Sequence, residues 1–424
     1  MNIGAVVIVT LLVLSFLGLP IYIALGIGTL IALNMADMAM LILPQKLFAG
    51  MNSASLLAIP FFVLAGNLMS RSITTKLLDV ANAFIGHVKG SLAAVTVVAS
   101  GLFGAISGSG VATASAIGGI TIPGMKKEGY PAPFAVGVAS ISSILGPIIP
   151  PSITLIVYAS ITNISVSALF MGSVVPGVLL VLSLIGYVLY YGKKHNLPAH
   201  EKMPASKIFG TLKGSIWALL MPVIILGGIF GGVFTPTEAA AVAVGYALFV
   251  SLFVYKDLKW SELPNAFVDA SVSTATIMMM VGLSKASSYV VVTSGLPQLL
   301  MKTFSAITDS KFVILLLLNL LFLVIGMLME ANAAIIMMTP ILTPLLSAYG
   351  IDPLAFGIVM SFNLCIGLVT PPVGLCLLLC NQIGETSLGK ALKAMMPMLA
   401  IAIILLMLIT YIDPLTTFLP TLLN

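Results

Sequence analysis

The side chains best suited to chemistry in this chain are a few hydroxyls and one carboxylate, all set within long apolar segments. Ser107-Gly108-Ser109-Gly110 interrupts one apolar stretch, and Glu330-Ala331-Asn332 interrupts another. Two proline pairs, Pro150-Pro151 and Pro371-Pro372, interrupt two more, and proline cannot continue a helix. Unwound backbone exposes carbonyl oxygens, which like hydroxyls are hard ligands for a small cation, and the helix N-termini beside such breaks attract anions. The sequence therefore predicts sites for a cation and an anion at broken helices.

Each polar interruption is predicted to lie beside one proline pair. One candidate cation site joins the Ser107–Gly110 tip to the first pair, and its counterpart joins the Glu330–Asn332 tip to the second. The candidate cation ligands are Ser107, Gly108, Ser109, Gly110, Pro150, Ser152, Glu330, Asn332, Thr370, Pro371 and Gly374. The candidate substrate contacts, expected between the two cation sites, are Ser109, Thr113, Pro151, Ser152, Thr154, Asn332, Pro372 and Val373. Glu330 is a functional candidate because an ionisable group at membrane depth is costly; protonation or exposure to water is the alternative.

Each motif taken alone also has an ordinary structural explanation. A proline pair usually kinks a membrane helix, and a Ser-Gly repeat usually allows close helix packing. The interruptions recur, however, at a constant offset of 221 residues. The matching pairs are Ala112/Ala333, Pro123/Pro344, Gly129/Gly350, Ser140/Ser361, Gly146/Gly367, Pro150/Pro371 and Pro151/Pro372. Helix breakers at corresponding places in two halves indicate the binding site of a transporter.

The composition is that of a membrane protein. Of the 424 residues, 60% are hydrophobic and 7% are charged, and the mean hydropathy is +1.19, whereas a soluble domain carries about 25% charged residues. Long apolar runs predict spanning helices at Ile3–Leu33, Val166–Tyr191, Ile216–Phe230, Phe312–Met329 and Leu399–Tyr411. The first basic residue is Lys46, so no cleavable signal is expected. The formal charge of +5 lies in loops, so it reports membrane topology and no nucleic-acid partner is expected.

The lysine-rich short segments are predicted to face the cytoplasm. They are Lys193–Lys213, Lys256–Lys259 and Lys390–Lys393, whereas Lys46, Lys285, Lys302 and Lys311 are exceptions to this bias. In this topology the N-terminus is cytoplasmic, Ile3–Leu33 crosses outward as one span bent near Pro20, and the C-terminus is periplasmic. The lipid bilayer of the bacterial inner membrane is the expected surrounding.

The predicted fold is an all-α polytopic membrane protein with inverted repeats, two re-entrant helical hairpins and two broken helices. The hairpins pair Ser91–Ile106 with Val111–Met125 and Phe312–Met329 with Asn332–Ser347. The broken helices pair Ala132–Leu145 with Ser152–Ile161 and Pro353–Leu368 with Leu375–Ile383. The predicted parts are scaffold helices and an interfacial segment (1–90), the first half of a transport domain (91–165), linking helices and the second scaffold (166–311), the second transport half (312–385) and a C-terminal helix (386–424).

Several other polar residues have predicted structural roles. Thr235-Pro236-Thr237-Glu238 is typical of a helix N-terminus with a capping box. Asn67 and Lys285 are predicted to be packing or snorkelling residues near span ends. The three cysteines, Cys365, Cys376 and Cys380, lie in apolar segments, which favours packing over a disulfide framework.

With these motifs in view, the chain resembles the large membrane subunit of tripartite ATP-independent periplasmic (TRAP) transporters over essentially its whole length. The residues that carry the resemblance are Phe61-Phe62-Val63-Leu64-Ala65-Gly66, Ser107-Gly108-Ser109-Gly110-Val111-Ala112-Thr113, Gly146-Pro147-Ile148-Ile149-Pro150-Pro151-Ser152, Phe234-Thr235-Pro236-Thr237-Glu238-Ala239-Ala240 and Val369-Thr370-Pro371-Pro372-Val373-Gly374. The resemblance implies an elevator mechanism, in which a transport domain slides against a scaffold, and coupling to sodium ions. It also implies a periplasmic substrate-binding protein and a small four-helix membrane subunit, expected here as a separate polypeptide.

The resemblance further implies an organic-acid substrate, sialic acid or a C4-dicarboxylate. The continuation Gly374-Leu375-Cys376, in place of Gly-Leu-Asn, favours sialic acid. The principal alternative is a sodium-coupled carboxylate transporter that works without a binding protein. A channel would favour a symmetric pore ring, and no P-loop for ATP is present. An intramembrane hydrolase would need a base near Ser109, yet His87, His195 and His200 all fall in predicted cytoplasmic segments. No enzymatic activity is therefore expected.

Overall fold

The computed structural model describes residues 2–199 and 202–423, and within these residues every regular element is a helix. His200 lies outside the described residues. Eight of the described helices are long and apolar enough to cross a membrane, or nine if the bent pair α3 (Ile42–Met51) and the start of α4 (Ala58–Ile85) counts as one span. This architecture confirms the predicted all-α polytopic membrane fold.

The molecule contains two helical hairpins. The first consists of α5 (Ser91–Ser107) and α6 (Gly110–Lys127), and the second consists of α15 (Lys311–Leu328) and α16 (Ala331–Ala348). The helices confirm the predicted arms to within a few residues, because the glycines and the tip residues act locally as helix breakers. The N-cap residues of α6 and α16, Ser109 and Glu330, are 221 positions apart.

Each hairpin is followed by a helix that breaks at a proline pair. The first comprises α7 (Ala132–Ser143), the short α8 (Leu145–Ile148) and α9 (Ile153–Thr162); the second comprises α17 (Pro353–Gly367) and α18 (Leu375–Gly384). Both breaks contain a cis Pro-Pro peptide bond. The predicted breaks are confirmed. The inverted orientation of the two halves in the membrane stays a prediction.

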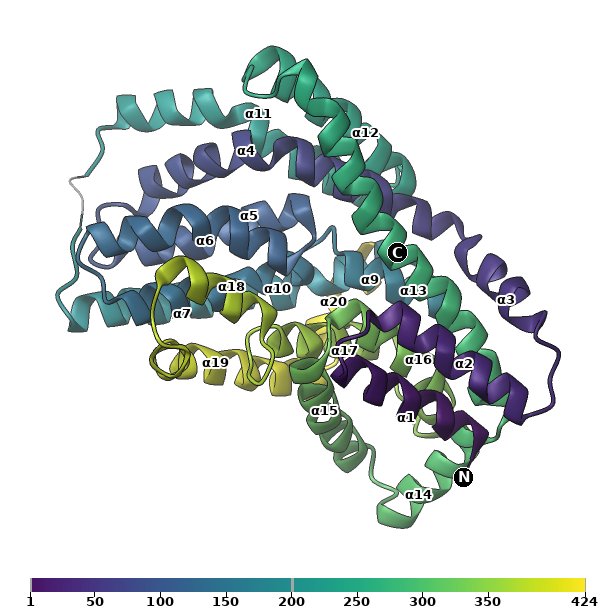
Figure 1. The fold of residues 1–424 in the computed structure, drawn as a ribbon. Coiled ribbons are helices and arrows are strands. Elements are labelled where there is room, and N and C mark those ends of the chain that lie inside the picture. Colours follow the sequence, from purple (N-terminus) through teal and green to yellow (C-terminus); the bar gives the residue numbers. More distant parts are fainter. Residues whose placement is uncertain (1, 200–201, 424) are drawn as a thin grey trace.

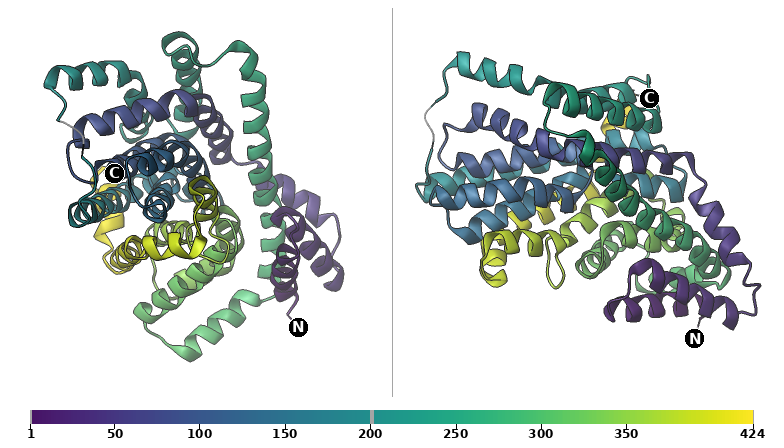
Figure 2. Two further views of the ribbon diagram at one scale, coloured as in Figure 1. Left: turned by 60° about the vertical axis from the view of Figure 1, so that its left-hand side comes forward. Right: turned by 45° about the horizontal axis from the view of Figure 1, so that its top comes forward.

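The remaining long helices surround the hairpins and broken helices. They are α10 (Val166–Lys194), α11 (Ala205–Phe230), α12 (Pro236–Phe249), α13 (Leu263–Thr293) and α19 (Leu388–Tyr411). Figure 2 shows α4, α11, α12 and α13 along two sides of the central bundle. The predicted capping box at the start of α12 is confirmed, because Thr235 Oγ1 accepts from Glu238 N and the Glu238 carboxylate accepts from Thr235 N at 2.8 Å.

The prediction of one bent span over Ile3–Leu33 is wrong. The segment forms two short helices, α1 (Ile3–Phe16) and α2 (Ile21–Met35), which lie side by side (Figure 1). Gly18, with a φ of 88°, makes the turn between them, and Gly28 of α2 lies against Val7 and Thr10 of α1. At 1.5 Å per residue each helix is about 22 Å long, shorter than the roughly 30 Å apolar core of a bilayer.

This hairpin fixes which end of the molecule holds the N-terminus, while its side of the membrane stays a prediction. Asn2 Nδ2 donates to Ser294 O at 2.9 Å, which places Asn2 at the C-terminal end of α13. At the far end of the molecule, Lys126 Nζ donates to Gly384 O at 3.1 Å and Gly90 N donates to Pro198 O at 3.2 Å. Several predicted cytoplasmic segments therefore meet at one end, and the N-terminus lies at the other.

Candidate functional site

The tip of the first hairpin is built from the Ser-Gly sequence. Ser109 is the N-cap of α6, and its Oγ accepts from Ala112 N at 3.4 Å. Its carbonyl oxygen accepts from Thr113 Oγ1 at 2.8 Å, and Ser107 Oγ lies 3.4 Å from the same hydroxyl. Gly108 adopts a φ of 61°, in the left-handed region that favours glycine. Hydroxyl and carbonyl oxygens thus gather at one turn, a donor set suited to a hard cation.

The first tip rests directly on the first break. A Cβ atom at Gly104 would lie 2.8 Å from Gly146 Cα, and one at Gly108 would lie 2.7 Å from Pro151 O. In the other direction, a Cβ at Gly146 would lie 2.6 Å from Ser109 O. Glycines at these positions therefore allow backbone-to-backbone contact between hairpin and broken helix, as the sequence predicts for the first site.

A cluster of four buried oxygens lies within the first break. Ser152 Oγ is 2.7 Å from Thr154 Oγ1, and both hydroxyls donate to Pro147 O. Ser361 Oγ of α17 donates to Thr154 Oγ1 at 2.9 Å. Since Ser361 belongs to the second half of the chain, this cluster joins the two halves.

The second tip pairs with the second break in the same way. Glu330 is the N-cap of α16: its Oε2 accepts from Ala333 N at 3.2 Å and its Oε1 accepts from Asn332 Nδ2 at 2.8 Å. Val373 N donates to Met327 O at 3.2 Å, so the end of α15 contacts the unwound segment. In both halves, therefore, the hairpin lies against the break that follows it in sequence, as predicted.

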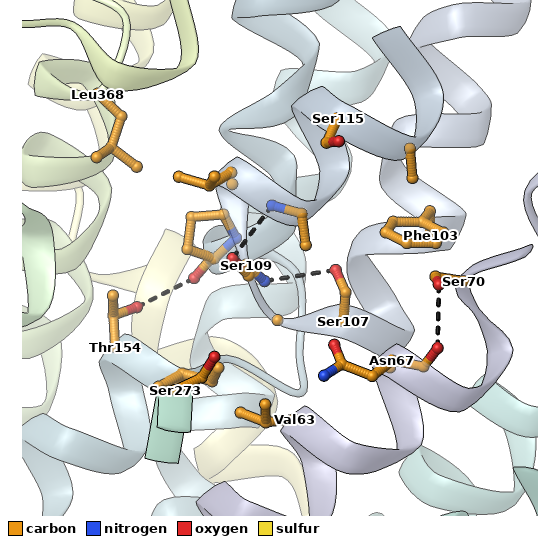
Figure 3. A pocket seen from close by; sticks show the side chains of 18 of the residues that line it. Val63, Asn67, Ser70, Phe103, Ser107, Ser109, Ser115, Thr154, Ser273 and Leu368 are labelled. Carbon is orange, nitrogen blue, oxygen red and sulfur yellow. Dashed lines mark hydrogen bonds between the residues drawn. The ribbon is translucent and has the colours of Figure 1, made fainter. Parts of the chain in front are cut away.

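Both tips and the first break face one cavity of about 660 Å³. Three helices begin at its wall: α6 at Gly110, α9 at Ile153 and α16 at Ala331. Figure 3 shows Ser107, Ser109 and Thr154 around the cavity. Leu368, the last residue before the second break, lies near the first tip, since a Cβ atom at Gly110 would lie 3.2 Å from Leu368 Cδ1. Backbone N–H groups at helix N-termini carry partial positive charge. The cavity therefore combines oxygen-rich tips with two helix ends that attract an anion, those of α6 and α9, while the Glu330 carboxylate caps the third.

Not every predicted site residue lies on this cavity. The predicted residues that line it are Ser107, Gly108, Ser109, Gly110, Thr154, Glu330 and Asn332. Thr113 and Ser152 are fully buried behind it, hydrogen-bonded to Ser109 O and Pro147 O respectively. The others, which do not belong to the described lining, are Pro150, Pro151, Thr370, Pro371, Pro372, Val373 and Gly374. The assignment of these residues to cation or substrate stays a prediction.

The opposite wall of the cavity comes from helices that sequence reasoning did not connect with the site. It comprises Val63, Gly66, Asn67, Ser70 and Thr74 of α4, with Ser273 and Ile277 of α13. Asn67, predicted to be a packing residue, has an exposed side chain on the cavity wall (Figure 3). No local pattern marks these positions, because only tertiary packing brings α4 and α13 to the tips.

Titratable side chains contribute little to a possible cation site. Among the described residues, no three His, Cys, Asp or Glu side chains come together as a metal site. A cation here would therefore use mainly hydroxyl and carbonyl oxygens, with the Glu330 carboxylate at the second tip. His87 and His195 follow α4 and α10 at the base of the first hairpin, whereas Ser109 is at its tip. The 17-residue arm α5 separates base and tip by about 25 Å. The three cysteines are free and buried.

The fold and the cavity define a multi-pass membrane protein with a cavity between broken helices, the arrangement of a secondary transporter. Residues 8–415 match the family model of the tripartite ATP-independent periplasmic transporter, DctM component. The chain belongs to this family, so it is a permease component and not an enzyme.

Individual relatives agree with the family assignment. Over 376 residues the chain is 40% identical to the C4-dicarboxylate TRAP transporter large permease protein DctM of Pseudomonas aeruginosa, covering 88% of each chain. Over 379 residues it is 38% identical to the sialic acid TRAP transporter large permease protein SiaM of Vibrio cholerae, covering 89% of each. The fold is similar to that of the Alcanivorax borkumensis YdaH transporter, with a TM-score of 0.60 at 15% identity and 86% of each chain covered.

Proposed function

We propose that this chain is the large membrane subunit of a sodium-driven importer of organic acids in the bacterial inner membrane. In this proposal a periplasmic binding protein delivers the acid, and a small four-helix membrane subunit completes the complex. The relatives named for a C4-dicarboxylate and for sialic acid, at 40% and 38% identity, support an organic acid and do not separate these two substrates. The proposal commits to a carboxylate and leaves the choice between them to experiment.

The observation that carries the proposal is the charge distribution of the cavity. Among its described lining residues, Glu330 is the one ionisable side chain, and none is lysine or arginine. A carboxylate bound there would find no basic side chain among these residues, so its charge would have to be balanced by other groups. The N-termini of α6 and α9 supply part of the positive charge, whereas the Glu330 carboxylate already caps α16. Sodium ions at the two hairpin tips would supply the rest, which makes binding of the acid depend on sodium.

The shape of the cavity favours an inward-open state. Its lining continues from the tips along α6 through Ser115 and Ile120 toward Lys126. That end of the molecule carries the lysine-rich segments expected in the cytoplasm. In this orientation the N-terminus would face the periplasm and not the cytoplasm as the sequence predicts, since Asn2 contacts Ser294. The end of α19 would face the same side, since Tyr411 Oη donates to Phe312 O at 3.1 Å. For import, the hairpins and broken helices would move as a unit along α4 and α13, as an elevator does.

The test is uptake into proteoliposomes that contain this chain and its small partner. Labelled sialic acid or succinate is supplied with the cognate binding protein present or omitted, and with an inward sodium gradient present or absent. Uptake that needs both sodium and the binding protein is the expected result. Uptake with sodium alone would favour a stand-alone carboxylate transporter. Uptake of either acid at the same rate without sodium would refute the coupling.

A further inference from the structure

A second cavity, of about 430 Å³, lies farther along α13. It is enclosed on one side by α3 and α13 and on the other by the end of α9 and the second half of α16. Its polar lining includes Asn52, Ser160, Asn163, Ser284, Ser288 and Thr343. Among the described lining residues, Lys285 is the one charged side chain. A cavity with polar walls and a single cation is suited to an anion.

Lys285 is available to a ligand. Its side chain is exposed, and the described residues provide it with neither a hydrogen bond nor an ion pair. Gly50 of α3 brings backbone close to it, since a Cβ there would lie 2.8 Å from Lys285 Cβ. One turn farther on, the ammonium group of Lys46 lies 4.5 Å from the centre of the Tyr289 ring. Lys285 is eight residues from the end of α13, and an unpaired cation at such depth is a functional candidate.

One face of α13 lines both cavities. Ser273 and Ile277 face the first, and Val281, Lys285 and Ser288 face the second, at steps of three or four residues. Such steps keep side chains on one side of a helix. Ser273 and Lys285 are twelve residues apart, which corresponds to about 18 Å along the axis. The two cavities are therefore successive positions on a single helical surface.

We propose that the second cavity is a binding site for the carboxylate group of the transported acid on the external side, with Lys285 as its counter-charge. The inference rests on the proposed function and adds a site to it. In the outward state the acid contacts Lys285 first. It then passes to the hydroxyls and helix N-termini of the first cavity, which has no basic side chain among its described lining residues.

The decisive experiment measures binding without transport. Ser288→Cys places a thiol in the second cavity, three residues from Lys285, while the native cysteines are buried. The complex is labelled with a membrane-impermeant maleimide in the presence of succinate, sialic acid or the uncharged succinamide. At millimolar concentration, at least one acid should slow labelling by about fivefold, and succinamide should not. The protection should disappear with Lys285→Gln and return with Lys285→Arg.

Uptake gives a second, separate measure. With substrate-loaded binding protein, Lys285→Gln should raise the KM for uptake by about tenfold, and the charge-retaining Lys285→Arg should reverse most of that rise. The control Lys302→Gln should leave the KM unchanged. Lys302 lines a different cavity, between α14 (Leu296–Ile307) and the base of the second hairpin. Absence of protection by both acids, or equal protection in Lys285→Gln, overturns the inference. If the unaltered complex takes up neither acid, the proposed function fails, and the labelling result still decides whether the second cavity binds carboxylates.

Discussion

The contact between the first hairpin tip and the first break can be tested by one methyl group. Gly146→Ala removes no polar atom, yet its Cβ would lie 2.6 Å from Ser109 O and 2.7 Å from Thr113 Oγ1. Ordinary contact begins at 3.4 Å, so tip and break must separate by about 0.8 Å at Ser109. Overpacking of this kind costs about 1–3 kcal/mol. That range corresponds to a change of about 5-fold to 150-fold in an equilibrium that depends on the contact.

The assay is sodium-driven uptake as a function of sodium concentration. If the cation site is shared between Ser109 and the first break, Gly146→Ala should lower uptake at least about fivefold and raise the sodium concentration for half-maximal rate. Gly119→Ala is the matched control, because its Cβ would meet nothing within 4 Å and it lies on the same hairpin. Gly367→Ala tests the second half, where the new Cβ would press on the backbone of Gly326.

Folding must be monitored together with transport. Each variant is accepted only if it purifies as a monodisperse complex, and its thermal unfolding in detergent is compared with that of the unaltered chain. A well-folded Gly146→Ala complex with unchanged maximal rate and unchanged sodium dependence would refute the placement of a cation site at this contact.

Three further predictions address the hydroxyls, the topology and the capping box. Ser109→Ala or Thr370→Ala should weaken sodium-driven uptake more than expression, since each removes one candidate oxygen ligand; unchanged sodium dependence in both would count against the ligand assignment. Cysteines placed at the exposed positions Ser206 and Ser347 should label from opposite sides of the membrane, and labelling from one side only would exclude the inverted topology. Thr235→Ala removes the N-cap of α12 and should lower stability by about 1 kcal/mol in a thermal unfolding assay. The sodium dependence of uptake should not change, because neither Thr235 nor any residue of α12 belongs to the described lining of the cavity; a change there would show that the cap acts on the site.

The sequence was sufficient for the centre of the fold because helix breakers act locally. Val111 and Asn332 were the predicted starts of the second hairpin arms, and the structure begins these helices one residue earlier. The failure over Ile3–Leu33 has an equally physical cause. Hydropathy measures the length of an apolar segment and not its direction. The turn at Gly18 and the contact of Gly28 with Val7 become visible only in three dimensions.

The candidate site also has one half that local sequence predicts and one half that only tertiary packing creates. Its oxygen-rich half was predicted because Ser107, Ser109 and Glu330 stand beside helix breakers. Its other half, from α4 and α13, was not predicted, because residues such as Asn67 and Ser273 lie in ordinary helical sequence and reach the cavity through packing alone. In the sequence Ser361 stands out only as the repeat partner of Ser140, whereas in the structure it donates to Thr154 across the halves.

This division leads to a prediction about specificity. Carboxylate recognition by helix N-termini uses backbone groups, which any acid can share, so it does not distinguish a C4-dicarboxylate from sialic acid. Discrimination must then come from side chains that face the rest of the substrate, and in the cavity these include Val63, Asn67 and Ser273. Exchanging these three for the residues of a relative with a different substrate should shift the ratio of kcat/KM for the two acids.

The control is an exchange confined to the first tip, residues 107–110, which should change the sodium dependence and leave the substrate ratio in place. For both sets of exchanges, the ratio of kcat/KM for the two acids is measured by competition uptake with the two labelled acids and their binding proteins. The reverse outcome, with substrate preference following the tip and not α4 and α13, would mean that the tip side chains contact the variable part of the substrate. The helix N-termini would then no longer suffice as an account of carboxylate binding.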